Sequence, residues 1–209
     1  MIYTTETRNF YLSPGVNCTI EIPVPDLRAD PDQAPGLGKS RSEKSENLDQ
    51  FLSEIFFPQY TRALKKANAC YMSADLPEKF LCGANVAVRS LPSRIDGIHG
   101  FYNYDDDIIV INADTLVIGC KTASGEFVYG HEIGHRIVFK KNAADSDAAI
   151  SDVCSILMIS DCKLAQEYLC DAFGELIAFD SREPSTFKQK TGTKMEGLMH
   201  TALKLAWSC

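Results

Sequence analysis

The five residues His131-Glu132-Ile133-Gly134-His135 constrain this chain more than any other stretch. On a helix, residues four positions apart lie one above the other, so His131 and His135 can direct both imidazoles at one metal ion. Glu132 is turned by about 100° from His131, which brings its carboxylate to a metal-bound water rather than to the metal itself. The pattern H-E-x-x-H therefore predicts a zinc site in which Glu132 acts as the general base.

The residues around the motif favour the helix that this geometry needs. Ser124 can cap its N-terminus, and Glu126 in the first turn interacts favourably with the helix dipole. The helix has two stripes, both expected to be buried, which contain Val128, His131, His135 and Val138, and Tyr129, Ile133 and Ile137. Gly130 and Gly134 are poor helix formers, so we expect them to allow close packing against a neighbouring segment.

A second helix is predicted over residues 164–179, and it carries two carboxylates four positions apart. Glu167 and Asp171 lie on one face of this helix, and an apolar face lies beside them. Carboxylates on an otherwise buried helix are costly unless they have a task. Glu167 as the third metal ligand, with Asp171 accepting the free N–H of a ligating histidine, would give both carboxylates a task.

The HEIGH motif, followed downstream by E-x-x-x-D on a second helix, resembles the gluzincin metallopeptidases. The stretch EYLCDAFGELIAF is similar to the corresponding helix of the ImmA/IrrE-type members and of related minimal gluzincins. This resemblance implies a zincin-like fold with His131, His135 and Glu167 as zinc ligands. It also implies Glu132 as the catalytic base and acid, and Asp171 as the partner of His131.

The resemblance covers residues 125–180 well and residues 100–120 loosely. Within it, Cys170 replaces the usual small residue before Asp171, and Gly174-Glu175 replaces a small apolar pair. Neither departure touches an implied ligand. Glu175 nevertheless leaves an alternative ligand assignment open.

Length and composition place further limits on the chain. Its 209 residues allow one domain, or one domain with an appended segment. The net charge of −7 and the pI near 5.1 argue against direct contact with nucleic acid. The sequence shows no transmembrane helix and no signal peptide, so we expect a cytoplasmic protein without a membrane partner. The eight cysteines contain no C-x-x-C pair, so we expect free thiols.

We divide the chain into an N-terminal extended segment, residues 1–47, and a zincin-like metallopeptidase domain, residues 48–209. At the start of the first segment, apolar and polar residues alternate weakly, which predicts one or two short strands. Residues 29–47 are rich in Asp, Pro, Gly, Ser and charge, which predicts an exposed loop. If the segment covered the cleft, Cys18 could ligate the zinc as a thiolate.

Strand signals follow a predicted helix over residues 47–70 that Pro58 kinks or splits. We assign residues 107–112 to an edge strand that lies along the cleft and pairs with an extended peptide substrate. Residues 116–118 are either another strand or the start of the next element. The acidic run at residues 105–107 predicts a solvated turn, with a cation site as the alternative.

The sequence offers several donors for the oxyanion of the transition state. His200 flanks the apolar stripe of a helix predicted over residues 194–207, and it is either such a donor or an ordinary surface residue. Four other residues compete for the same role and the sequence does not choose among them: Tyr129, Tyr102, Tyr104 and His99.

The predicted fold is α+β, with a small mixed sheet, an edge strand over the cleft, the HExxH helix and a second helix carrying ExxxD. The predicted activity is hydrolysis of peptide bonds in a peptide or protein substrate. It requires one Zn²⁺ per chain. We expect an endopeptidase with a narrow range of substrates. One alternative is an inactive zincin-like domain with structural zinc that acts as a protein-binding or regulatory module. Another is an α+β domain without metal.

Overall fold

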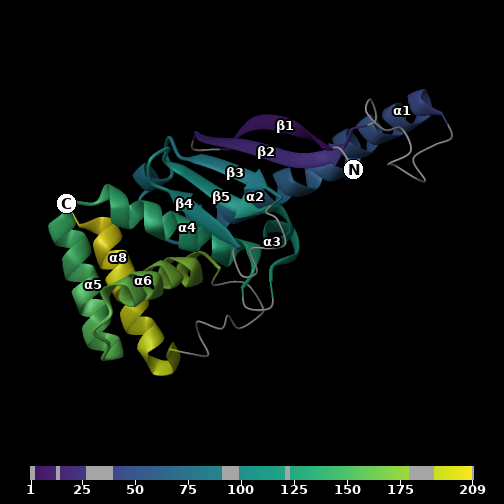
Figure 1. Ribbon diagram of the computed structural model, residues 1–209. Coiled ribbons are helices and arrows are strands. Elements are labelled where there is room, and N and C mark those ends of the chain that lie inside the picture. Colours follow the sequence, from purple (N-terminus) through teal and green to yellow (C-terminus); the bar gives the residue numbers. More distant parts are fainter. Residues whose placement is uncertain are drawn as a thin grey trace.

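A mixed five-stranded sheet forms the centre of the structure, with the strand order β1-β2-β3-β5-β4 (Figure 1). The computed structural model of the protein describes residues 3–12, 15–26, 40–90, 99–120, 123–178 and 191–208. The strands are β1 (Tyr3–Leu12), β2 (Val16–Pro25), β3 (Asn85–Arg89), β4 (Gly100–Asn103) and β5 (Ile108–Asn112). The helices are α1 (Arg41–Phe51), α2 (Phe57–Ser73), α3 (Ala113–Ile118), α4 (Gly125–Lys140), α5 (Ala143–Leu157), α6 (Cys162–Ile177) and α8 (Met195–Trp207). The predicted α+β class with a small mixed sheet is confirmed.

Parallel and antiparallel pairs are combined in this sheet. β1 and β2 form an antiparallel pair, whereas β2 with β3 and β3 with β5 are parallel. β4 is antiparallel to β5 and lies at the edge. The prediction that residues 107–112 form the edge strand is therefore wrong. A tight hairpin places β4 outside β5, so β5 has a partner on both sides.

One face of the sheet is buried against helices. In β2 every second side chain from Val16 to Val24 is buried, as the period of two in a strand requires. The strand register aligns two rows across this face: Cys18–Val86–Ile109–Tyr102 and Ile20–Val88–Ile111–Gly100. Gly100 and Tyr102 of the edge strand therefore face the helical layer rather than solvent.

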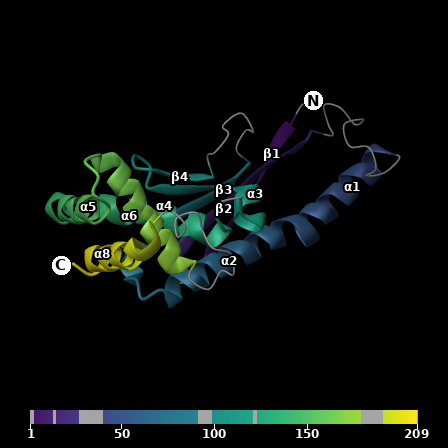
Figure 2. The ribbon, with the colours of Figure 1, turned by 90° about the horizontal axis from the view of Figure 1, so that it is seen from below.

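Helix α4 lies between the sheet and the group formed by α5, α6 and α8 (Figure 1). It packs against β4 and β5 on one side and against α6 on another, and α6 packs in turn on α5 and α8. Figure 2 shows α5, α6 and α8 at one end of the molecule and α1 at the other. Within the described ranges, no helix combines the length and the apolar character that crossing a bilayer requires.

Helices α1 and α2 form one long helix that a π-helical turn, Leu52–Phe56, interrupts (Figure 2). Pro58 lies just after this turn, in the first turn of α2, and it has no backbone N–H to continue the helical hydrogen bonds from the preceding residues. The predicted helix with a break near Pro58 is therefore confirmed. Residues 116–118, predicted as another strand or as the start of the next element, are the C-terminal end of α3, so neither alternative holds.

The predicted loop over residues 29–47 is wrong at its C-terminal end. Helix α1 begins at Arg41, because the side chain of Ser40 accepts a hydrogen bond from the backbone N–H of Glu43 at 3.1 Å and caps the helix. Residues 29–39 lie outside the described residues. The polar composition of the segment concealed an N-cap followed by good helix formers.

The two N-terminal strands extend the same sheet as the rest of the fold. β2 pairs with β3 from Asn17 to Glu21, and its buried side chains join the main core. The division of the chain into residues 1–47 and 48–209 stays a prediction. The structure adds that β1 and β2 belong to the sheet of the second part.

Cys18 lies on the buried face of β2, packed into the core. Burial raises the pKa of its thiol to about 12, so a thiolate there is unfavourable. The alternative in which Cys18 ligates zinc therefore has no support from its position. Each cysteine in the described part of the chain is a free thiol, as predicted.

Candidate metal centre

Helix α4 begins and ends where the sequence places local signals. The hydroxyl of Ser124 accepts a hydrogen bond from the backbone N–H of Phe127 at 3.2 Å, which confirms Ser124 as the N-cap. Glu126 in the first turn forms an ion pair with Lys66 of α2. The helix then continues without interruption through the motif to Lys140.

Two glycines allow α4 and α6 to approach each other closely. A Cβ on Gly130 would lie 3.0 Å from the Cα of Gly174, and one on Gly134 would lie 3.0 Å from the Cα of Cys170. A methyl group at either position would force the helices apart. The predicted packing role of Gly130 and Gly134 is therefore confirmed, and it brings the carboxylates of α6 to the histidines of α4.

Three side chains from these two helices converge on one point. The Nε2 atoms of His131 and His135 are 3.1 Å apart. Oε2 of Glu167 lies 3.5 Å from Nε2 of His131 and 3.7 Å from Nε2 of His135. A group of His131, His135 and Glu167 close enough to hold one metal ion is thus present, with one ligand atom from each residue.

Asp171 fixes the orientation of the first histidine. Its Oδ1 lies 2.8 Å from Nδ1 of His131, so the ring donates its Nδ1–H to the carboxylate and presents the Nε2 lone pair to the metal position. Burial alone would lower the pKa of His131. Hydrogen bonds to Asp171 and Glu167 outweigh it and raise that pKa to about 10. The site therefore attracts positive charge.

The ionised form of Glu167 is strongly favoured, and its side chain is accessible to solvent. The imidazoles of His131 and His135 hold the pKa of Glu167 well below its usual range. Its side chain is 55% exposed, whereas His135 as a whole is 9% exposed. The carboxylate is therefore ionised at neutral pH and lies at the open side of the group.

In contrast to Glu167, Glu132 lies in the interior of the protein. It is 5% exposed, and within the described residues its Oε2 has no hydrogen-bond partner. Burial, the largest cause, raises the pKa of Glu132, while the neighbouring imidazoles of His131 and His135 oppose that rise. A buried carboxylate oxygen without a partner is costly, and such a group is typical of a catalytic acid or base.

The edge strand determines where Glu132 can lie. A Cβ on Gly100 would lie 3.0 Å from Oε1 and 3.1 Å from Cγ of Glu132. Only a glycine at this end of the buried row leaves room for that carboxylate between β4 and α4. Sequence reasoning did not assign a role to Gly100, because the sequence gives no strand pairing for it.

A second polar cluster on α4, absent from the predicted site, joins the helix to the β4–β5 hairpin. Asp107 accepts hydrogen bonds from the hydroxyl of Tyr102 at 2.7 Å and from Arg136 Nε and Nη2 at 2.8 and 3.0 Å. Lys140 adds an ion pair at 2.9 Å, and Arg136 also donates to the backbone oxygen of Phe80. Asp107, one of the three acids of the predicted turn, therefore anchors the hairpin to α4.

The other two residues of the acidic run form the turn itself. The backbone N–H of Asp105 donates to the side chain of Asn103, whose amide donates to Asp106 at 2.8 Å. The metal-holding group found in the described residues contains none of these three acids, so the solvated-turn interpretation is the one supported. Glu175, the alternative ligand, is buried in α6 and is likewise not part of that group.

Two of the candidate oxyanion donors lie in unsuitable places. Tyr129 is 0% exposed, and its ring is surrounded by the core near Cys18 and Tyr71, where burial raises its pKa. A substrate has no access to it there. His200 is an exposed residue of α8, which packs on α5 and α6.

Two further candidates already have partners. The hydroxyl of Tyr102 donates to Asp107, and Nδ1 of His99 lies 3.2 Å from the hydroxyl of Thr115. Tyr104 also has a partner, Gln166, but this partner directly precedes Glu167, and Tyr104 as a residue is 45% exposed. Burial, followed by the charges of nearby acidic groups including Glu167 and Glu132, raises the pKa of Tyr104 and keeps it protonated. Tyr104 is therefore the best-placed donor of the five.

Neither a protein-family model, nor a curated protein, nor a solved structure matched this chain in the three comparisons with known proteins. The resemblance to gluzincins thus rests on the motif residues alone.

Proposed function

We propose that the protein is a zinc-dependent peptidase of the gluzincin type, acting on an extended peptide or protein substrate. The observation that carries the proposal is Glu132. Its buried, unpartnered Oε2 lies beside the group of His131, His135 and Glu167. A base next to three metal ligands is the minimum that metal-assisted hydrolysis requires.

Zinc is the metal that fits this donor set best. Two imidazoles and one carboxylate are the ligands of many catalytic zinc sites. In a tetrahedral site with bonds of about 2.0–2.1 Å, two ligand atoms lie about 3.3 Å apart. The three ligand-atom separations here are 3.1, 3.5 and 3.7 Å, which agree with that spacing within a few tenths of an ångström.

The ligand number and the exposure favour a catalytic rather than a structural metal. Structural zinc sites are closed by four protein ligands, whereas catalytic sites keep a position for water. The group contains three residues among those described, and Glu167 is half exposed to solvent. These features support a reactive centre over a binding module with structural zinc.

In this proposal, residues of the chain have separate roles in the reaction. Bound zinc would polarise the scissile carbonyl and lower the pKa of a water. Glu132 would accept the proton of that water and later donate it to the leaving amine. Among the described residues, no strand pairs with the outer edge of β4, so a substrate added there as an extra strand would place its peptide bond beside Glu132.

Tyr104 is the residue best placed to donate a hydrogen bond to the developing oxyanion. Its ring is held by Tyr102 at 5.0 Å and by Phe139 at 5.2 Å between ring centroids. Tyr104→Phe should lower the turnover number and leave the zinc content unchanged. An unchanged turnover number would remove Tyr104 from the mechanism.

The decisive experiment is zinc stoichiometry by elemental analysis on the wild type, Glu167→Ala and the control Glu196→Ala. Glu196 is an exposed acid of α8 outside the metal group. We expect one zinc per chain in the wild type and in the control, and loss or strong weakening in Glu167→Ala. Full zinc in Glu167→Ala would put Glu167 out of the site. No zinc in the wild type after reconstitution would overturn the peptidase proposal.

A further inference from the structure

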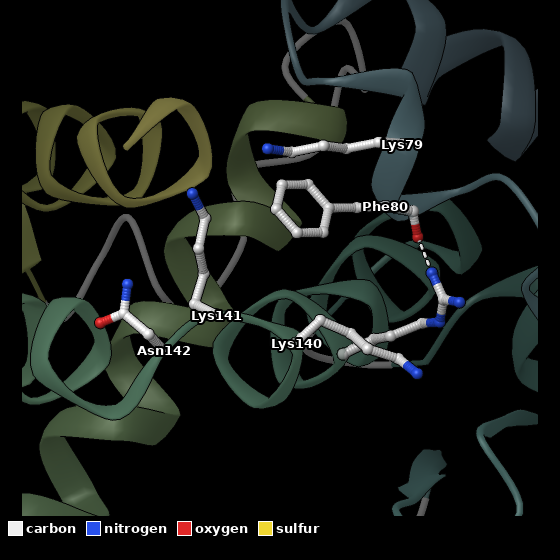
Figure 3. A pocket seen from close by; sticks show the side chains of 6 residues that line it. Lys79, Phe80, Lys140, Lys141 and Asn142 are labelled. Carbon is white, nitrogen blue, oxygen red and sulfur yellow. Dashed lines mark hydrogen bonds between the residues drawn. The ribbon is translucent and has the colours of Figure 1, made fainter. Parts of the chain in front are cut away.

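A basic pocket lies at the C-terminal end of α4, apart from the metal group. It encloses about 430 Å³ and is lined by Lys79, Phe80, Arg136, Lys140, Lys141 and Asn142 (Figure 3). The volume falls within the range of about 300–1,000 Å³ that is typical of small-molecule sites. Four of these six residues are cationic, although the whole chain carries a net charge of −7.

Two ammonium groups converge on one aromatic ring in this pocket. Nζ of Lys79 lies 5.1 Å and Nζ of Lys141 lies 5.4 Å from the ring centroid of Phe80. Figure 3 shows both amino groups on the same side of Phe80, with the amide of Asn142 below them. The Lys141 ammonium also donates to the backbone oxygen and the hydroxyl of Ser208. Lys79 is therefore the lysine that offers most of its donors to an anion in the pocket.

The charge of the pocket is only partly neutralised from within. Arg136 and Lys140 share the single carboxylate of Asp107. Among the residues that the structure describes, Lys79 is exposed and has no carboxylate within ion-pairing distance. The pocket therefore has a local excess of positive charge on an acidic protein.

We propose that this pocket binds a small multivalent anion of the phosphate class. Lysine ammonium groups bind phosphate oxygens as point charges, and charge-assisted hydrogen bonds of this kind are the strong ones. The amide of Asn142 adds a further polar group at the rim, and Phe80 supplies an apolar wall. The pocket contains no metal ligand, so the binding does not depend on the proposed peptidase function.

The pocket is nevertheless joined to the metal helix. Arg136 follows His135 directly in the chain, and its guanidinium bridges Phe80 and Asp107. An anion in the pocket would thus lie against the residue that anchors the β4–β5 hairpin to α4.

The test is calorimetric titration of the full chain with inorganic pyrophosphate at low ionic strength. The proteins compared are the wild type, Lys79→Glu and the control Lys65→Glu, which reverses an exposed charge on α2. Lys79 is chosen because its exposed side chain contacts the ring of Phe80 and forms no ion pair within the described residues, so we expect the variant to fold. Each titration is made with and without added zinc, because pyrophosphate also binds metal ions.

We expect binding to the wild type and to Lys65→Glu, with the same affinity whether or not zinc is present. In Lys79→Glu the dissociation constant should rise at least about tenfold, as the loss of one charge-assisted contact predicts. Equal weakening in the two variants would show a general charge effect and overturn the proposal. Binding that appears only with zinc, or no binding at millimolar pyrophosphate, would overturn it as well.

Discussion

Helix α4 carries two polar clusters of opposite character. On the side of the β4–β5 hairpin, Asp107 is surrounded by donors from Tyr102, Arg136 and Lys140. At the candidate metal group, the buried atoms Oε2 of Glu132 and Nδ1 of His135 have no partner within the described residues. The two clusters lie within one turn of each other along the same helix.

The difference separates a structural role from a chemical one. A buried charge whose hydrogen bonds are complete fixes two elements relative to each other, which is what Asp107 does for the hairpin and α4. A buried carboxylate left without a partner reduces stability and persists where it has another use. Glu132 belongs to the second kind, and the following experiments test that assignment.

The largest effect is expected for Glu132→Gln. The variant should keep its zinc and lose roughly 10²–10⁴-fold in turnover of a peptide substrate, the usual contribution of a general base. Its free energy of unfolding should stay equal or rise, because a neutral amide replaces a buried carboxylate. Hydrolysis of unfolded casein, elemental analysis and urea unfolding measure the three quantities.

Glu126→Gln, six positions earlier on the same helix, is the control for this change. It should retain both zinc and activity. Full activity of Glu132→Gln in the presence of bound zinc would show that Glu132 is not the general base. Bound zinc without hydrolysis in the wild type would instead favour the binding-module alternative.

On the hairpin side, Asp107→Ala should reduce the free energy of unfolding by about 3–5 kcal/mol, because it leaves the buried Arg136 without its partner. Arg136 is 5% exposed, so water cannot replace the lost carboxylate. Urea unfolding measures the change, and Asp105→Ala in the same turn is the control, with an expected change below about 0.5 kcal/mol. Equal effects of the two substitutions would contradict the anchoring role.

The same anchor predicts a pH dependence of stability. Burial alone would raise the pKa of Asp107, but hydrogen bonds from Arg136, Tyr102 and Lys140 hold it well below its usual range. Since the folded pKa lies below the unfolded value of about 3.9, the stabilisation is complete above that value. It is lost as the pH falls through the folded pKa.

Asp107→Asn should therefore flatten the decline in unfolding free energy below about pH 4 relative to the wild type. Urea unfolding at a series of acidic pH values measures this slope. Parallel curves for the two proteins would show that Asp107 titrates alike in the folded and unfolded states.

A smaller effect is expected at the partner of the first histidine. Asp171→Asn should weaken zinc binding by roughly 10–100-fold, the usual effect of removing the group that orients a ligating histidine. Competition with a chelating dye measures this affinity. The exposed acid Asp147 of α5 provides the matched control, Asp147→Asn, which should leave the affinity unchanged. If the two variants bind zinc equally well, Asp171 does not orient His131.

The smallest effect is expected for Lys140→Gln. Its side chain is exposed to solvent, so the ion pair with Asp107 should contribute at most about 1 kcal/mol to the unfolding free energy. Urea unfolding beside Asp107→Ala measures the difference. A loss as large as that of Asp107→Ala would mean that Lys140, rather than Arg136, anchors the hairpin.

Much of the candidate site follows from local patterns. The spacing of His131, Glu132 and His135 requires a helix, and Ser124 marks where that helix begins. Glu167 and Asp171 share a face of α6 because they are four residues apart, and both reach His131 as predicted. These relations hold within single helices, whose geometry is fixed by the backbone.

Strand order was the main error, because pairing depends on contacts distant in sequence. Residues 107–112 give a strong strand pattern, but nothing in them tells whether another strand lies outside. The register that puts Gly100 beside Glu132 likewise exists only in the folded sheet. A glycine in a short strand gave no sign of that contact.

The sequence by itself determined the α+β class and the helices that carry His131, His135 and Glu167, the group close enough to hold a metal ion. Helical periodicity and capping are local and can be read from neighbouring residues. Only the tertiary structure decided which strand forms the edge, that Asp107 meets Arg136, and that Tyr104 contacts Gln166, the residue before Glu167. Those choices depend on which surfaces pack together, and packing joins residues that the sequence keeps apart.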